Sequence, residues 1–194
     1  MSETFDDELK DHFIYRYPTE KANILKSCKT DWQVVINAFP NTEGDIFSAV
    51  DLWAMEHNTA SVFQLMRILE EGMSALSAEV SVTYNTQSWY NIISEIEKAI
   101  KIEAQKPKTS EKESRMQFLS EAAKEFSYFK DGWRNYVSHN KCEYDEHQAR
   151  SVMEHVRQFM TTLAMNLDFS EESSVRLGPN LLGSHQHKAP ERSQ

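Results

Sequence analysis

A short polar segment in the second half of the chain has residue types that suit phosphate chemistry. It contains Arg134, Asn135, Ser138 and His139, which all lie off the apolar stripe of the helix predicted around them. Arginine binds phosphate oxygens through two N–H groups, and histidine takes up or releases a proton near neutral pH. Asn and Ser side chains also hydrogen-bond to phosphate. The segment predicts a site that binds phosphate or transfers protons, although an isolated Arg and His pair is more simply two solvent-facing residues.

Arg134 and His139 do not share a face of a regular helix. Five residues advance an α-helix by about 140°, whereas Asn135 and His139 lie about 40° apart. The guanidinium and the imidazole meet only if the helix unwinds near Asn140 or if the site forms across two subunits. The second case would make dimerisation a condition for activity.

Arg67 and Glu70 form a second candidate set on an earlier predicted helix. Glu70 lies at the edge of that helix's apolar stripe, and Arg67 lies further out. One interpretation is that Glu70 orients Arg134 through a charge-assisted hydrogen bond. The other is that both residues are ordinary solvated helix charges.

The apolar pattern predicts an all-α protein. Apolar residues recur at intervals of three and four through most of the chain, and Gly and Pro together number only 10 of 194 residues. Only 80–84 is a weak strand candidate. We therefore expect an antiparallel helical bundle of about five helices. The helical patterns cover residues 19–39, 45–76 with an interruption at 57–59, 86–100, 118–137 and 145–167.

Local signals indicate where these helices begin and which side chains anchor them. Asp145 is a good N-cap for the last helix, Asp45 is a candidate cap for the second, and Thr86 or Ser88 suits the third. The bulky aromatic residues predicted to lie in the core are Trp53, Trp89 and Trp133.

Composition predicts three regions. Residues 1–44 form an N-terminal arm and helix, residues 45–168 form the bundle, and residues 169–194 form a disordered C-terminal tail that is polar and contains Gly and Pro. The polar segment 104–114, which contains Pro107, is the best candidate for an internal loop.

Charge and motif content exclude several classes of function. The net charge of −9 argues against a general nucleic-acid coat protein. The charge is uneven, because residues 106–160 hold ten Lys and Arg against nine Asp and Glu. Neither a membrane span, a secretory signal, a Gly-rich phosphate loop nor a metal-ligand motif is visible. We expect a soluble, cytoplasmic, reduced protein that needs no metal and no cofactor.

The polar segment and its surroundings resemble the HEPN family (higher eukaryotes and prokaryotes nucleotide-binding). The family motif is Arg, four to six residues and then His, often with a polar residue after the Arg, as in Arg134-Asn-x-x-x-His139. The segments Asn58–Met73 and Tyr144-Asp145-Glu146 are also similar to those of bacterial HEPN-like proteins. The resemblance covers about residues 45–168.

The resemblance implies an all-α homodimer whose two motifs face each other across the interface. Many members resemble metal-independent endoribonucleases of toxin–antitoxin and other defence systems, which implies RNA or a nucleotide, and an antitoxin or another defence protein, as partners. Arg134 would then stabilise the phosphorane, His139 would act as base or acid, and Asn135 or Ser138 would orient the phosphate or the imidazole. The products would be a 2′,3′-cyclic phosphate and a 5′-hydroxyl.

Two other interpretations remain open. Some members have lost catalysis and act as nucleotide-binding or protein-interaction modules, which would suit the acidic surface. A purely structural dimer, or a regulatory subunit of a larger defence complex, is the third.

Overall fold

The computed structural model describes residues 16–83, 88–105, 109–134 and 143–167. These residues contain helices and no strand, which confirms the all-α prediction. None of the described helices is both long enough and apolar enough to span a membrane. The described elements are α2 (Thr19–Asp31), α3 (Gln33–Ala38), the 3-10 turn η1 (Pro40–Thr42), α4 (Glu43–Ala54), α5 (Asn58–Glu79), α6 (Trp89–Ala104), α7 (Ser110–Phe129), the π-helical turn η2 (Lys130–Arg134) and α9 (Glu146–Asn166).

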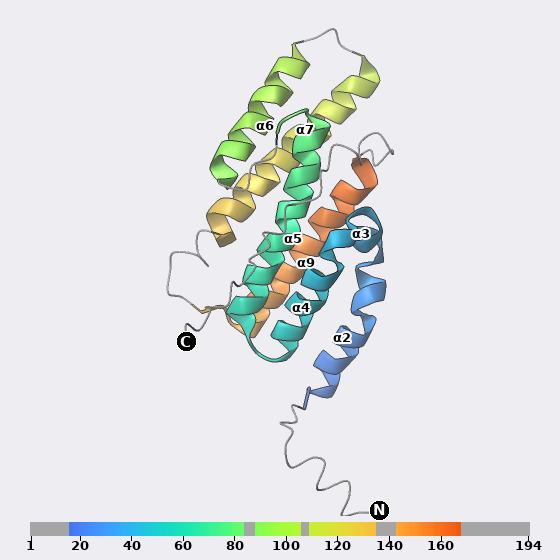
Figure 1. Ribbon diagram of the computed structural model, residues 1–194, viewed down its shortest axis with the longest axis vertical. Coiled ribbons are helices and arrows are strands. Elements are labelled where there is room, and N and C mark those ends of the chain that lie inside the picture. Colours follow the sequence, from blue (N-terminus) through green and yellow to red (C-terminus); the bar gives the residue numbers. More distant parts are fainter. Residues whose placement is uncertain (1–15, 84–87, 106–108, 135–142, 168–194) are drawn as a thin grey trace, which may run out of the picture.

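Helices α5 and α9 run side by side through the middle of the fold (Figure 1). On one side α4, joined to α5 by residues 55–57, packs along α5, while α2 contacts α4 and α3 contacts α9. On the other side α6 and α7 pack against each other and reach α5. The fold therefore places the π-helical turn η2, which continues α7, on the side away from α2.

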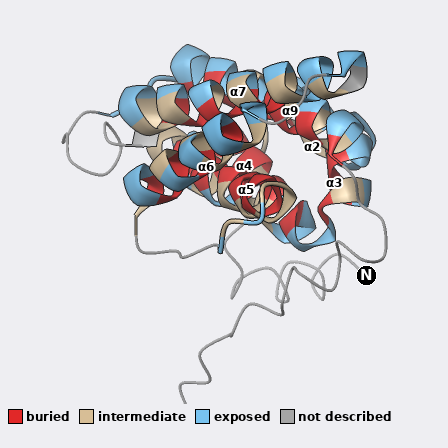
Figure 2. Cartoon of the chain, turned by 90° about the horizontal axis from the view of Figure 1, so that it is seen from above, coloured by how far each residue is buried: buried red, intermediate tan, exposed pale blue. Residues whose placement is uncertain are grey.

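The buried faces of these helices turn toward one another and form one hydrophobic core (Figure 2). Trp53 and Trp89 are almost fully buried, as predicted, whereas Trp133 is partly buried and packs against the edge of the core. Residues of α2 and α3, such as Trp32 and Phe39, belong to the same core as the rest. The largest fully buried side chains are Trp53, Phe126, Phe129, Ile46, Leu65, Ile68, Leu69, Met73, Leu76, Ile96, Met160 and Leu163.

Gly72 marks a close approach of α5 to α9. A Cβ atom placed on Gly72 would lie 2.7 Å from Met160 Sδ and 2.9 Å from Leu163 Cδ1. Both neighbouring side chains are fully buried, so they have little room to move away. The absence of a side chain at Gly72 therefore sets the spacing of the two central helices.

Several helix boundaries follow the sequence signals. Asp145 caps α9, because its carboxylate accepts a hydrogen bond from the backbone N–H of Gln148 at 2.8 Å, and the Gln148 side chain returns a bond to the backbone N–H of Asp145. Ser88 is the cap of α6. These two sites follow the usual preference for short polar residues at the N-cap.

Other boundaries differ from the sequence prediction. The single helix predicted over 19–39 is divided at Trp32, whose φ of −105° and ψ of 9° leave the α region. Asp45 does not cap α4, because that helix begins at Glu43 directly after the turn that starts at Pro40. The described residues thus contain seven α-helices rather than about five.

Helix α7 begins earlier and ends earlier than predicted. It starts at Ser110, capped by Thr109, so the loop predicted over 104–114 is shorter on this side. Its α-helical part ends at Phe129 and the π-helical turn η2 follows, whereas the sequence predicted one regular helix to Val137. This change of helix type comes immediately before the polar segment that opened the sequence analysis.

Candidate functional site

The described chain enters the Arg134-Asn-x-x-x-His139 motif through the π-helical turn η2, whose last residue is Arg134. A π-helix bonds residues five apart and occurs mostly as single turns, often at functional sites. The backbone of Arg134 is thus placed, while Asn135, Ser138 and His139 lie outside the described residues. The sequence predicts a regular α-helix through this region, but the chain is π-helical from Lys130 to Arg134.

The π-helical turn carries Trp133 onto an aromatic cluster around His155 of α9. The Tyr128 and Trp133 rings, which are five residues apart, have centroids separated by 5.5 Å. The imidazole of His155 stacks on Tyr128 at 5.8 Å and meets the edges of Phe129 and Trp133, each at 5.2 Å. Since Arg134 follows Trp133 directly, the cluster brings an imidazole from α9 next to the start of the motif.

His155 also forms a hydrogen-bonded pair with a carboxylate of α7. Its Nε2 atom contacts Glu125 Oε1. The imidazole is 42% exposed and the carboxylate 32% exposed, so solvent reaches both groups. Nδ1 of His155 makes no hydrogen bond to any side chain in the described part of the chain. A carboxylate at one ring nitrogen orients the imidazole and leaves the other nitrogen available.

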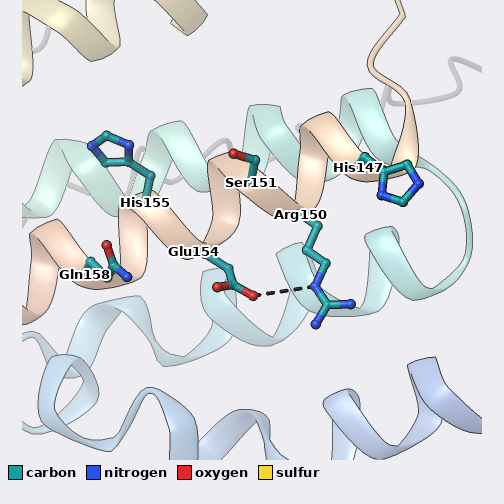
Figure 3. Close-up of a pocket in the computed structure, with 6 residues that line it drawn as sticks. All are labelled: His147, Arg150, Ser151, Glu154, His155 and Gln158. Carbon is teal, nitrogen blue, oxygen red and sulfur yellow. Dashed lines mark hydrogen bonds and ion pairs between the residues drawn. The ribbon is translucent and has the colours of Figure 1, made fainter.

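Two hollows meet at this imidazole. The larger, of about 420 Å³, lies along α9 and is lined only by residues of that helix. Figure 3 shows His155, Ser151 and His147 along one edge of the helix and Arg150 and Glu154 along the other. A smaller hollow of about 210 Å³ lies between α7 and α9 and is lined by Glu125, His155 and neighbouring residues. His155 therefore lies where a ligand could contact both helices.

The start of α9 is attached to the corner between α4 and α5. The backbone N–H of Tyr144 donates to Thr59 Oγ1 at 3.0 Å, and Trp53 Nε1 donates to the carbonyl oxygen of Glu146 at 3.3 Å. Both described ends of the chain that flank the motif are consequently anchored along α9, one beside His155 and one at its first turn. At 1.5 Å per residue these two points on α9 are roughly 15 Å apart.

Charged groups near this site are largely paired. Lys130 bonds to Asp131 at 3.1 Å, and its ammonium lies 5.2 Å from the centre of the Tyr90 ring. Arg150 bonds to Glu154 at 3.5 Å and lies over the Trp53 ring. The groups of the described site that can contact a ligand are therefore the aromatic surface and the His155–Glu125 pair.

Arg67 and Glu70 have partners of their own. Arg67 Nε donates to Asp45 Oδ1 at 3.1 Å, and Glu70 accepts a hydrogen bond from Trp89 Nε1 at 2.9 Å. Gln64 also bonds to Asp45. These contacts attach α5 to α4 and to α6, and the predicted role of Glu70 as a partner of Arg134 stays a prediction.

Glu71 is the carboxyl with the clearest perturbation in this part of α5. Burial raises its pKa, and the nearby carboxylates of Asp45 and Glu70 raise it further, while Asn41 and Arg67 act in the opposite direction. Burial disfavours the charged form of a carboxyl group. The surroundings of Glu71 therefore disfavour its ionised form, and we assign no ligand site to these carboxylates.

Sequence reasoning found the motif but missed the pair next to it. Glu125 and His155 are 30 residues apart and lie on different helices, so no local spacing joins them. The sequence signal for the pair was weak: each residue lies next to the apolar stripe of an amphipathic helix, and such a stripe packs against another helix.

No group of three or more His, Cys, Asp or Glu in the described ranges is arranged to hold a metal ion. No family model matches the chain, and neither a curated protein nor a solved structure matches it.

Proposed function

We propose that this protein is a metal-independent endoribonuclease of the HEPN type. The observation that carries the proposal is the position of Arg134 at the end of a π-helical turn whose Trp133 packs on a partly exposed imidazole–carboxylate pair. Phosphate binding and proton transfer are the two functions that RNA cleavage without a metal requires. Residue types for both are concentrated at this end of α7.

In the proposed reaction the 2′-hydroxyl of RNA attacks the neighbouring phosphorus. Arg134 binds the non-bridging oxygens and stabilises the extra negative charge of the phosphorane. His139 transfers a proton, and Asn135 and Ser138 orient the phosphate or the imidazole. The bond from phosphorus to the 5′-oxygen breaks, which leaves a 2′,3′-cyclic phosphate and a 5′-hydroxyl.

The proposal also includes the assembly. Two protomers of this antiparallel bundle would bring their motifs together, and a cytoplasmic antitoxin or another defence protein would control the dimer. Composite sites of this kind arise naturally at a two-fold interface, because the same patch occurs on both subunits.

The test is cleavage of end-labelled RNA in EDTA by the wild-type protein and by the variants Arg134→Ala and His139→Ala. We expect the wild type to cleave and each variant to be slower by about 10²-fold or more, since each removes a group that acts in the transition state. His147→Ala is the matched control, because His147 is an exposed histidine on α9 without a carboxylate partner among the described contacts. Equal rates for wild type and His139→Ala, together with equal growth arrest in cells, would contradict the proposal.

A non-catalytic nucleotide-binding module is the second candidate. The observation that favours it is the aromatic surface beside the hollow along α9, which offers Tyr128 and Trp133 to a base while the net charge of −9 disfavours long RNA. Binding of a mononucleotide without any loss of RNA would identify this function instead.

A further inference from the structure

We propose that a pocket between α2, α4 and α9 binds a free α-amino acid with an apolar side chain. The pocket has a volume of about 200 Å³. Pockets for drug-sized ligands measure roughly 300–1,000 Å³, so this one suits a smaller molecule. Its described lining comes from α2, Trp32, α4 and α9 and includes no residue of α7 or η2. The inference is therefore independent of the proposed ribonuclease site.

The buried part of the pocket lining is apolar and uncharged. It consists of Cys28, Trp32, Val50, Trp53 and Met153. Burial, and to a lesser degree the nearby carboxylate of Asp31, raises the pKa of the Cys28 thiol to about 11. The thiol is therefore neutral at pH 7, and the inner part of the pocket accepts an aliphatic or aromatic side chain rather than a charged one.

The outer part of the lining carries two charged groups of each sign. Arg150 and Glu154 pair with each other at 3.5 Å (Figure 3), and Arg150 also reaches Glu20 at 3.8 Å. These two groups thus largely satisfy each other. The other two, Asp31 on α2 and Arg157 on α9, line the same pocket.

Asp31 and Arg157 keep their charges without an ionic partner. Arg157 Nη1 donates to the backbone carbonyl oxygen of Asp31 at 3.5 Å, and the Asp31 carboxylate accepts a hydrogen bond from the Ser27 hydroxyl at 2.6 Å. Within the described ranges neither side chain forms an ion pair, with the other or with a third residue. Asp31 is exposed and Arg157 half-buried, so water solvates both charges while the pocket is empty.

This charge pattern selects the class of ligand. A simple anion would meet the carboxylates of Asp31 and Glu154, and a simple cation would meet the guanidinium groups of Arg150 and Arg157. A zwitterion satisfies both signs, because its carboxylate accepts from Arg157 and its ammonium donates to Asp31. The side chain of such an amino acid would then lie on the buried apolar lining.

The first experiment is calorimetric titration of the full-length protein with L-phenylalanine and with L-leucine. We expect saturable binding at one site per chain. Arg157→Gln and Asp31→Asn should each weaken it by about 10–100-fold, because each removes one charge-assisted hydrogen bond. Arg115→Gln is the matched control, since Arg115 is an exposed arginine on α7 that pairs with Glu79, and it should bind like the wild type.

The second experiment assigns each ligand charge to its residue. L-phenylalaninamide lacks the carboxylate, and N-acetyl-L-phenylalanine lacks the ammonium, so the wild type should bind both more weakly than L-phenylalanine. Binding of the amide should respond to Asp31→Asn and not to Arg157→Gln, and binding of the N-acetyl compound should show the reverse.

The third experiment fills the pocket without changing its charges. Ile24 lines the pocket and is only partly buried, so Ile24→Phe should abolish binding while thermal unfolding stays close to that of the wild type. If this variant does not fold, the two charge variants carry the test, because both alter residues that solvent reaches.

Three results would overturn the inference. One is that the folded wild-type protein binds neither amino acid. Another is that Arg157→Gln binds as tightly as Arg115→Gln. The third is that the amide binds as tightly as the free amino acid, which would mean that the pocket recognises an amine or a peptide N-terminus instead. None of these measurements uses RNA, so failure here leaves the proposed ribonuclease function as it stands.

Discussion

At the scale of single residues, Glu70 accepts a hydrogen bond from Trp89 Nε1 and so connects α5 to α6. The sequence had suggested instead that this carboxylate orients Arg134. Removal of a hydrogen-bond acceptor from a largely buried donor costs about 1–3 kcal/mol. We expect Glu70→Ala to lower the free energy of unfolding by about this amount, and Glu70→Gln, which keeps an acceptor, to lower it less. Urea denaturation followed by tryptophan fluorescence measures both.

The opposite result would support the interpretation from the sequence, in which Glu70 orients Arg134. If Glu70→Ala retains full stability but slows RNA cleavage as much as Arg134→Ala does, then Glu70 orients Arg134 in the active assembly.

Glu71 gives a pH-dependent prediction. Its pKa is raised mainly by burial, so the folded state holds the proton more tightly than the unfolded state. The stability that comes from the protonated carboxyl is present below the ordinary pKa of 4.5 and is lost as the pH rises through the raised value. We expect Glu71→Gln to increase stability at pH 7 and to leave it unchanged at acidic pH. A gain of equal size at both pH values would show that the charge is not the cause.

At the scale of elements, Gly72 controls how closely α5 and α9 pack. Since a Cβ at this position would lie within 3 Å of two buried side chains, we expect Gly72→Ala to destabilise the protein by about 1–3 kcal/mol despite the better helix propensity of alanine. Gly44 in α4 is the matched control, because no atom lies within 4 Å of its added Cβ. Gly44→Ala should stabilise by about 0.5–1 kcal/mol.

The urea denaturation midpoints of Gly72→Ala and Gly44→Ala, compared with that of the wild type, test whether α5 and α9 pack tightly at Gly72. If both glycine variants were stabilised equally, the two central helices would be free to move apart, which would contradict tight packing at Gly72.

The sequence predicted those helices and caps that depend on residues close together in the chain. The apolar stripe of α9 and its Asp145 cap follow from spacing and residue type alone. The break at Trp32 and the π-helical turn at 130–134 do not, because the packing of distant side chains decides the backbone there. Gly132 lowers the helix propensity of the turn, but a glycine does not specify a π-helical turn or the contact of Trp133 with His155 that it makes possible.

At the scale of the whole molecule, the proposed dimer predicts complementation between inactive variants. If Arg134 of one subunit acts with His139 of the other, a heterodimer of Arg134→Ala and His139→Ala contains one intact site of two. An equal mixture, after subunit exchange, should then recover about one quarter of the wild-type activity. Sedimentation measures the dimer, and the EDTA assay measures the recovery.

The result distinguishes two arrangements. Mixtures that stay inactive, although sedimentation shows mixed dimers, would mean that each subunit carries its own complete site.

The π-helical turn has one more consequence for the molecule. A π-turn holds an extra residue compared with an α-turn, so its origin is equivalent to a one-residue insertion in an ordinary helix. Loss of that residue would rotate Trp133 by about 100° relative to α7 and separate it from the His155 ring of α9. The helices up to Phe129 would keep their packing. Deletion of one residue in the turn would thus change the aromatic surroundings of His155 while the buried core before it stays intact.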